Sequence, residues 1–163
     1  MVYLIGLIAD SHDNLEAIGR AVDYLNRESV DLVIHAGDLI SPFTAPEFAR
    51  LEMKFEAVFG NNDGERDGLR KAYSGLTELS DFKVLRFDGL RIAVIHGHEV
   101  ELLECVIESG RYDLVVTGHT HERRFSDSGT LTINPGELCG YLSGERTAAL
   151  LDTDSMECEF VSL

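Results

Sequence analysis

The residues of this chain that could do chemistry lie in five short polar clusters, each directly after an apolar run. The clusters are Asp10-Ser11-His12, Gly37-Asp38, Gly60-Asn61-Asn62-Asp63, His96-Gly97-His98 and Gly118-His119-Thr120-His121. Together they hold five of the six histidines. Carboxylate, amide and imidazole donors without a thiolate suit Mn²⁺, Fe, Co, Ni or Zn rather than an iron–sulfur cluster. The donors outnumber the ligands that one ion needs, so the pattern favours a site for two ions with a shared carboxylate.

Each cluster taken alone has an ordinary structural explanation. Residues 60–63 are typical of a turn, and a single histidine often caps a helix or completes a hydrogen bond in the core. The ordered set of clusters is what favours a metal site. His35, the sixth histidine, lies inside an apolar run, and we interpret it as a structural residue or a support for a ligand. No cysteine lies in the clusters, and neither a G-x-S-x-G turn nor a Walker A loop is present, which disfavours those chemistries.

The apolar runs predict the strands that must position these clusters. Residues 2–9, 32–36 and 55–59 have the continuous apolar character of strands buried on both faces. Three helices are expected at residues 13–27, with Asp13 or Asn14 as N-cap, 46–50 and 65–73. This β-α-β-α-β order implies parallel strands, whose carboxyl ends lie at one edge of a sheet. The clusters should meet at that edge, where α/β proteins form their sites.

The second half of the chain predicts a different arrangement of strands. A two-residue turn at Asp88-Gly89 joins residues 83–87 to 90–95 as a hairpin. A helix over residues 99–109 and a strand over 114–117 follow. Two further hairpins are expected around residues 127–129 and 152–155. The mixture favours an α/β fold in which two sheets pack face to face with helices outside.

Length and charge limit the classes of function. A chain of 163 residues has the size of one domain, so we expect residues 1–163 to form a single unit. The chain has 14 Lys and Arg against 29 Asp and Glu, a net charge of −15. That excess disfavours nucleic acid as a stable partner and a basic membrane-binding surface, since both depend on cationic side chains. It does not exclude a phosphate-bearing substrate, because a bound cation can invert the local sign of a site.

The cysteines and the apolar runs indicate the compartment. The three cysteines are odd in number and form no C-x-x-C pair, so we expect free thiols in a reducing cytosol. The apolar N-terminus has no basic segment before it, and no stretch reaches the ~18 apolar residues of a membrane span. A cytoplasmic protein with no membrane partner is therefore expected.

The order of the clusters resembles that of the calcineurin-like metallophosphoesterases. The family pattern is D-x-H, G-D, G-N-x-[D/E], H and G-H-x-H, which here extends from Asp10 to His121, and N-P-G follows at Asn134-Pro135-Gly136. The length is similar to that of the small archaeal and bacterial phosphodiesterase branch, whose members have no cap domain. The resemblance implies a four-layer α/β/β/α sandwich with two mixed β-sheets flanked by helices.

The resemblance also implies a role for each candidate ligand. Asp10, His12 and His121 would hold a first divalent ion, and Asp38 would bridge it to a second. Asn61, His96 and His119 would complete the second site. The implied reaction is in-line attack on a small phosphodiester by a water or hydroxide between the two ions. Mn²⁺ or Ni²⁺ is favoured, with Fe, Co or Zn as alternatives.

The chain departs from the family pattern beside two of these residues. Many members have a catalytic histidine after the ligand asparagine, where this chain has Asn62, and an amide cannot act as a general acid at neutral pH. His98 is the candidate replacement, unless it only hydrogen-bonds a supporting carboxylate. Asp63 is expected to orient Asn61 or its loop. Glu137 stands after N-P-G where serine is common, and the sequence assigns it no role.

Other functions are compatible with the same fold. The chain could be a protein-interaction scaffold similar to the retromer subunit of this fold, but such a scaffold would tolerate loss of ligands, and here every ligand position is filled. A phosphomonoesterase remains open. A nuclease is disfavoured by the acidic surface and the lack of a further domain. Exposed sheet edges would permit a homodimer.

Overall fold

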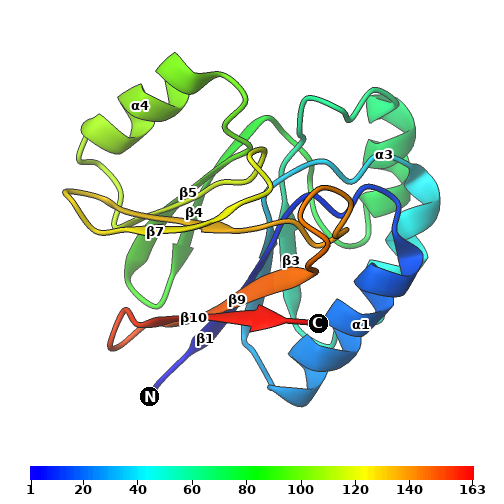
Figure 1. Cartoon of the computed structure of the whole chain (residues 1–163), viewed down its shortest axis with the longest axis horizontal. Coiled ribbons are helices and arrows are strands. Elements are labelled where there is room, and N and C mark those ends of the chain that lie inside the picture. The colour runs from blue at the N-terminus through cyan, green and yellow to red at the C-terminus, as the bar shows by residue number, and fades with distance from the viewer.

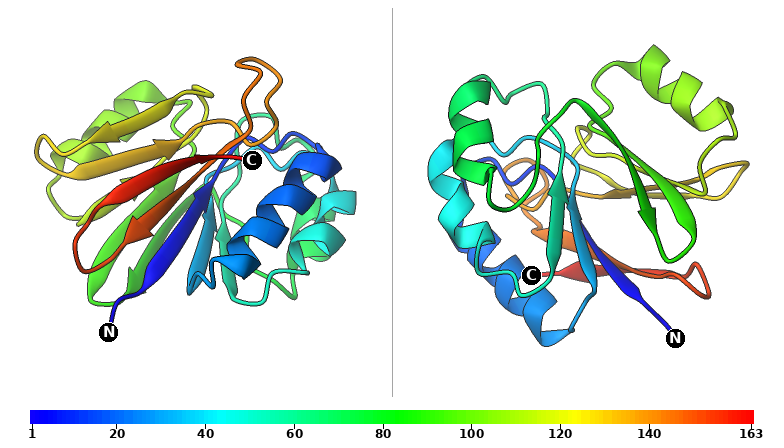
Figure 2. Two further views of the ribbon diagram at one scale, coloured as in Figure 1. Left: turned by 60° about the horizontal axis from the view of Figure 1, so that its bottom comes forward. Right: turned by 180° about the vertical axis from the view of Figure 1, so that it is seen from behind.

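The computed structural model describes all 163 residues, which form two five-stranded sheets packed face to face (Figure 1 and Figure 2). The first sheet has the strand order β10-β9-β1-β2-β3 and the second the order β4-β5-β6-β8-β7. The strands of the first sheet are β1 (Leu4–Ile8), β2 (Leu32–His35), β3 (Lys54–Ala57), β9 (Thr147–Asp152) and β10 (Cys158–Ser162). Those of the second are β4 (Phe82–Phe87), β5 (Leu90–Ile95), β6 (Leu114–Val116), β7 (Arg123–Ser126) and β8 (Leu131–Pro135).

Parallel pairing brings the ends of the cluster-bearing strands to one level. In the first sheet Ile8 lies opposite His35, and His35 lies opposite Ala57. In the second sheet Val116 lies between Val94 and Ile133, again in parallel strands. The predicted parallel order of the first three strands is therefore confirmed. Each polar cluster leaves its sheet within a few residues of these aligned positions.

The helices are α1 (Leu15–Arg27), α2 (Ala45–Phe48), α3 (Arg66–Tyr73) and α4 (Val100–Glu108), with a 3-10 turn η1 (Pro42–Thr44) before α2. Asn14 caps α1, because its side chain accepts a hydrogen bond from the Ala17 amide at 3.1 Å. None of the helices combines the length and apolar character that crossing a bilayer requires.

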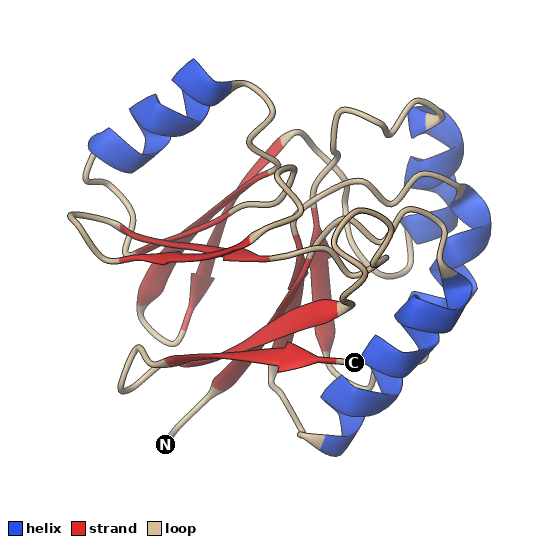
Figure 3. Cartoon of the chain, in the orientation of Figure 1, coloured by secondary structure: helices blue, strands red, loops and turns tan.

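Buried apolar side chains form the layers between these elements. Fourteen buried residues fill the space between the sheets, among them Leu7, Ile34, Val94 and Val116. A second core of 20 buried residues lies between the first sheet and α1, α2 and α3. On the outer face of the second sheet α4 lies alone, and no residue of it is fully buried (Figure 3). The predicted α/β/β/α sandwich with two mixed sheets is confirmed, and its fourth layer is a single exposed helix.

Several element boundaries differ from the sequence predictions by one or two residues. The first strand begins at Leu4 rather than at residue 2. The predicted helix at 46–50 is α2, one residue earlier at its start, with Pro46 in its first turn. The third strand ends at Ala57 rather than at residue 59. There the chain leaves the sheet, because the amide of Phe59 donates to the carbonyl of Ser80 at 2.9 Å.

Candidate metal centre

Three histidines and two aspartates converge where the strands of both sheets end. The Nε2 atoms of His12, His96 and His121 lie 3.7, 3.9 and 3.5 Å from one oxygen of Asp10, Oδ1. His12 and His96 also lie 3.3 and 3.4 Å from Oδ2 of Asp38. Both aspartate side chains are almost fully buried. The residues come from four of the five predicted clusters, so the sheets bring distant segments to one point.

The donor atoms fall into two groups that share Asp10. One group is Asp10, His12 and His121, and the other is Asp10, Asp38 and His96, with all donor atoms of a group within 4.8 Å of one another. The first group is the set expected for the first ion. Asp38 Oδ2 lies between the histidines of the two groups, as a bridging carboxylate would.

Several of these atoms have no hydrogen-bond partner although they are buried. They are Asp10 Oδ1, His12 Nε2 and His96 Nε2. An unsatisfied buried polar atom typically costs about 1–3 kcal/mol, so three of them aimed at one point need an explanation. A cation between them would satisfy all three. Mixed carboxylate and imidazole donors fit a divalent transition metal better than Ca²⁺, which prefers oxygen ligands alone.

Hydrogen bonds at the far side of two rings fix which nitrogen faces the centre. His96 donates from Nδ1 to the carbonyl of Ala36 at 2.7 Å, a contact that joins the second sheet to the first. His121 Nδ1 lies 2.6 Å from Oε2 of Glu137. Because a carbonyl or a carboxylate can only accept, Nδ1 carries the proton in both rings. Nε2 of each ring therefore faces the centre, where its lone pair could bind a cation.

The aspartates and histidines of the centre shift the pKa values of one another. Burial raises the pKa of Asp38, but the neighbouring His12 and His96 imidazoles lower it by more, and the net pKa lies well below its ordinary range. In return, Asp10 and Asp38 raise the pKa of His12 to about 9. A proton on His12 therefore competes with a metal ion for the same position.

His35 lies behind this centre and is held neutral. Burial lowers its pKa to about 3. Its Nδ1 accepts from the amide of Gly37 at 3.1 Å, so its Nε2 carries the proton and donates to the Ser11 hydroxyl at 2.8 Å. It thus ties the segment after β1 to the segment after β2 without facing the converging donor atoms.

The backbone at the centre adopts conformations that side chains ordinarily avoid. Five candidate ligands have left-handed φ angles, namely Asp10 at 52°, His12 at 41°, Asp38 at 63°, His119 at 71° and His121 at 61°. Each such residue costs on the order of 1 kcal/mol, and such strain clusters at functional sites. A Cβ at Gly60 would overlap the Asp38 carboxylate, so only glycine allows the two loops to approach.

A sequence profile described as the calcineurin-like phosphoesterase superfamily domain matches residues 3–156 of the chain. The chain belongs to the calcineurin-like phosphoesterase superfamily. The resemblance indicated by the sequence motifs is thereby confirmed.

One sequence relative and one solved structure are similar to this chain over almost their full length. A protein of Methanocaldococcus jannaschii named a phosphodiesterase is 44% identical over 157 residues, which are 94% of this chain and 95% of that protein. A solved structure of an archaeal phosphodiesterase matches with a TM-score of 0.93 at 42% identity and covers 98% of this chain and 99% of its own. Vacuolar protein sorting 29 of Cryptosporidium parvum matches with a TM-score of 0.68 at 20% identity over 99% and 97% of the two chains, which shows a common fold alone.

The other two expected ligands, Asn61 and His119, lie beside the converging donor atoms and contact each other. His119 Nδ1 is 3.1 Å from Asn61 Oδ1, and its ring lies 5.2 Å from that of His96 between centroids. Neither joins the two groups of converging donor atoms. Burial lowers the pKa of His119, so its ring is neutral at pH 7 and able to bind a cation.

The three residues expected to assist catalysis occupy different positions. Asn62 contacts Asp38 twice, through its backbone amide at 2.9 Å and its side-chain amide at 2.8 Å. Asp63 is buried and accepts hydrogen bonds from the amides of Gly60, Asp38 and Ile40 at 2.7, 3.1 and 2.6 Å. It orients the loops rather than the side chain of Asn61.

His98 lies at the open side of the centre. Its ring faces those of His96 and His119, with centroid distances of 5.8 and 6.1 Å. The nearest carboxylate, Glu99, is 3.7 Å away, too far for a hydrogen bond. A cavity of about 300 Å³ opens beside His98, and Arg66, Phe82 and Leu102 contribute to its walls. His98 thus lies beside two candidate ligands and also lines this cavity.

Sequence reasoning assigned no role to two residues that support the centre. Asn134 is buried and donates from Nδ2 to the carbonyl of Gly118 at 2.8 Å, which fixes the loop that carries His119 and His121. Glu137 is buried against His121. Their only signal in the sequence is their place in and directly after the N-P-G motif, where Glu137 replaces the common serine.

Proposed function

We propose that this chain is a metal-dependent phosphodiesterase that hydrolyses small phosphodiesters at a centre for two divalent ions. The observation that supports it most is the convergence of buried, unpartnered donor atoms of Asp10, His12 and His96 beside Asp38. Mn²⁺ or Ni²⁺ is the proposed metal, with Fe, Co or Zn as alternatives. The phosphodiesterase name of the relative at 44% identity supports the diester over the monoester.

The proposed ligands divide between the two ions as the superfamily pattern implies. Asp10, His12 and His121 would hold one ion, Asn61, His96 and His119 would hold the other, and Asp38 would be shared by both. Two divalent ions in such a site supply an acidified water as nucleophile and screen the charge of the phosphoryl oxygens. The protein's own contribution is a set of donors already turned toward one point by the contacts of His96 with Ala36 and of Asn62 with Asp38.

His98 is the proposed general acid. It lies beside two candidate ligands and lines an adjacent cavity that could take the leaving group of the ester. Asn62 has a positioning role, because both of its amides hold the Asp38 carboxylate. Asp63 positions the loops that carry Asp38 and Asn61.

The decisive experiment is a metal-reconstitution assay. Protein stripped with a chelator and reloaded with Mn²⁺ or Ni²⁺ should hydrolyse an activated aryl phosphodiester, and renewed chelation should abolish the activity. Asp38→Asn keeps the shape of the side chain and should remove most of the activity. Activity that survives both treatments would exclude the proposed centre. A parallel series of monoesters separates a diesterase from a monoesterase.

The alternative function is a protein-interaction scaffold, which the fold similarity to vacuolar protein sorting 29 leaves open. A scaffold would bind partners equally well with and without its metal ligands and would show no turnover in the same assay. We favour the enzyme because every ligand position of the phosphoesterase pattern is filled and the relative at 44% identity is named a phosphodiesterase. A reducing cytoplasm remains the proposed location, since all three cysteines are free and Cys105 is exposed. A homodimer remains a proposal.

A further inference from the structure

One buried acid of the site lies outside the proposed ligand set. Glu137 follows Gly136 directly and is 1% exposed, yet no lysine or arginine pairs with it. Its carboxylate instead accepts hydrogen bonds from His121, Cys139, Leu142 and Ser143. Burial of a carboxylate is unfavourable unless the carboxylate is fully hydrogen-bonded. These hydrogen bonds are therefore what allows Glu137 to be buried without a cationic partner.

Only Oε2 of Glu137 contacts His121, whereas both oxygens accept hydrogen bonds from the loop that follows. Oε2 faces the metal centre and lies 2.6 Å from His121 Nδ1, with Cys139 Sγ at 3.2 Å. Oε1 faces the following loop and accepts from the Ser143 hydroxyl at 2.6 Å and from the Leu142 amide at 3.0 Å. The carboxylate therefore joins a candidate ligand to the segment 138–143.

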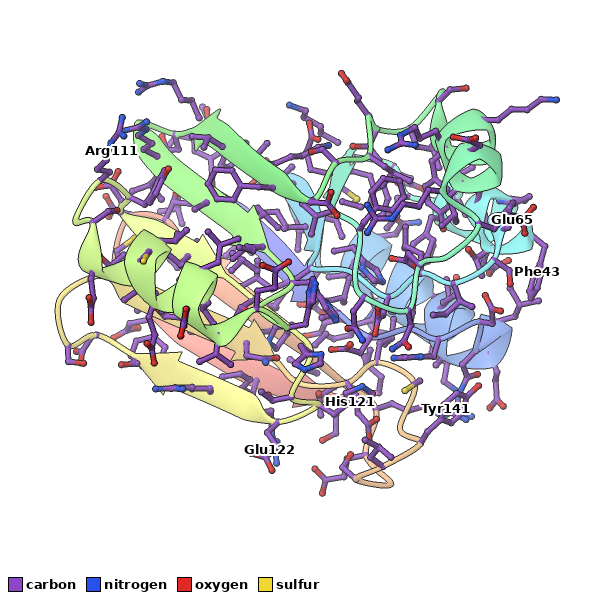
Figure 4. The ribbon with its side chains drawn as sticks, turned by 90° about the horizontal axis from the view of Figure 1, so that it is seen from above. Phe43, Glu65, Arg111, His121, Glu122 and Tyr141 are labelled. Carbon is purple, nitrogen blue, oxygen red and sulfur yellow. The ribbon has the colours of Figure 1, made fainter.

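The same segment is attached to the end of β1. The amide of Leu138 donates to the carbonyl of Ala9 at 2.9 Å, and that of Cys139 donates to the carbonyl of Asp10 at 3.0 Å. Figure 4 shows His121 beside the loop that carries Tyr141. Glu137 is thus held on a backbone already fixed against another candidate ligand.

The contact with Glu137 determines how His121 can act. The carboxylate only accepts, so Nδ1 must donate, and Nε2 is left to face Asp10 Oδ1 at 3.5 Å. A ring free to rotate or to move its proton to Nε2 would lose this orientation. Mutation of a carboxylate that holds a ligand histidine in this way typically lowers metal affinity or activity by about 10–100-fold.

We propose that Glu137 is a positioning residue of the metal centre, which fixes the ring and the tautomer of His121 and couples loop 138–143 to metal binding. This inference rests on the proposed metal centre. The competing explanation is that Glu137 only holds the loop together.

The test is a comparison of metal affinity in Glu137→Gln and in Ser143→Ala. Glutamine keeps the volume but replaces one acceptor oxygen by an NH₂ group, while every partner of Glu137 is a donor. Ser143→Ala removes a loop contact and leaves His121 untouched. Calorimetric titration with Mn²⁺ should show about 10–100-fold weaker binding of the first ion in Glu137→Gln. Ser143→Ala should bind within about threefold of wild type.

A double-mutant cycle separates positioning from loop stability. If Glu137 acts through His121, then Glu137→Gln should cost little further affinity in a His121→Ala background. Additive losses in that cycle, or wild-type affinity in Glu137→Gln, would overturn the inference. The Co²⁺-loaded proteins provide a second readout, since a moved ligand changes the visible absorption spectrum whereas a loosened loop alone does not.

A measurement on the wild-type protein keeps the inference testable if the variants do not fold. Nitrogen-15 NMR of the Zn²⁺-loaded chain should show the His121 proton on Nδ1, and a proton on Nε2 would contradict the proposal. A wild-type chain that binds no divalent ion would instead contradict the proposed function, so the two failures are distinguishable.

Discussion

At the scale of single residues, the proposed site consists of groups that would bind the ions and one group, His98, that is proposed to transfer a proton. Asn62, directly after the candidate ligand Asn61, holds Asp38 through two amides. His98 is the remaining imidazole that faces the candidate ligands without joining their groups. In the proposed reaction, His98 is therefore the candidate to supply the proton that an alkoxide leaving group needs.

Replacement of His98 should affect substrates according to their leaving groups. A general acid contributes about 10²–10⁴-fold when the leaving oxygen is basic, and little when the leaving group is already acidic. We expect His98→Ala to slow alkyl phosphodiesters by at least about 100-fold and p-nitrophenyl diesters by less than about tenfold. The measurement is kcat/KM over a leaving-group series, with Glu99→Gln as the control. Equal slowing across the series would remove His98 from this role.

His12 should make the stability of the metal-free protein depend on pH. Its folded-state pKa is about 9, against an ordinary value of 6.5, because Asp10 and Asp38 favour the protonated ring. A raised pKa stabilises the folded state fully below pH 6.5, and this stabilisation is lost as the pH rises through 9. Thermal unfolding of chelator-treated protein should therefore shift to lower temperature between these pH values. A His12→Gln variant should lack this shift, and an equal shift in both proteins would contradict the assignment.

At the scale of elements, Asp63 connects the loops after β2 and β3. It has no cation beside it and accepts three backbone amides from the two loops. These loops carry Asp38 and Asn61, so the Asp63 carboxylate fixes the positions of two candidate ligands without being a ligand itself.

Removal of the Asp63 carboxylate should therefore destabilise the protein as well as the site. Asp63→Ala leaves three amides without their acceptor, and each costs about 1–3 kcal/mol when buried. We expect the free energy of unfolding to fall by roughly 3 kcal/mol or more in urea titration. Asp67→Ala is the matched control, since Asp67 is fully exposed and contacts only Arg70. A loss of less than about 0.5 kcal/mol, the usual range of surface substitutions, would contradict this role.

The elements also show what a single sequence can and cannot predict. The strands before Asp10, Asp38 and His96 were predictable because apolar runs that end in polar residues are local patterns. The contact between His121 and Glu137 was not predictable, because the residue type does not show whether a glutamate is buried. Its burial depends on how loop 138–143 packs against the end of β1. The left-handed φ angles of Asp10 and Asp38 were unpredictable for a similar reason, since tertiary contacts impose them against local preference.

At the scale of the whole molecule, the net charge of −15 bears on how cation binding is interpreted. An acidic surface attracts divalent ions without any specific site. The proposed centre differs from that surface because Asp10 and Asp38 are almost fully buried and their neighbours are imidazoles. Salt screens exposed charges over a Debye length of about 3 Å at 1 M, whereas buried donors are screened far less.

Mn²⁺ should consequently raise the unfolding temperature even in 1 M NaCl. Free ion at 100 times its dissociation constant stabilises the folded state by about 2.7 kcal/mol, which for a chain of this size corresponds to a rise of roughly 5–10 °C. Asp38→Asn removes one buried charge and leaves the surface unchanged, so most of the rise should disappear in that variant. Differential scanning calorimetry at several Mn²⁺ concentrations measures both proteins. An equal rise in the two, or a rise abolished by salt in the wild type, would mean that the ion binds the acidic surface and that the buried donors do not form a metal centre.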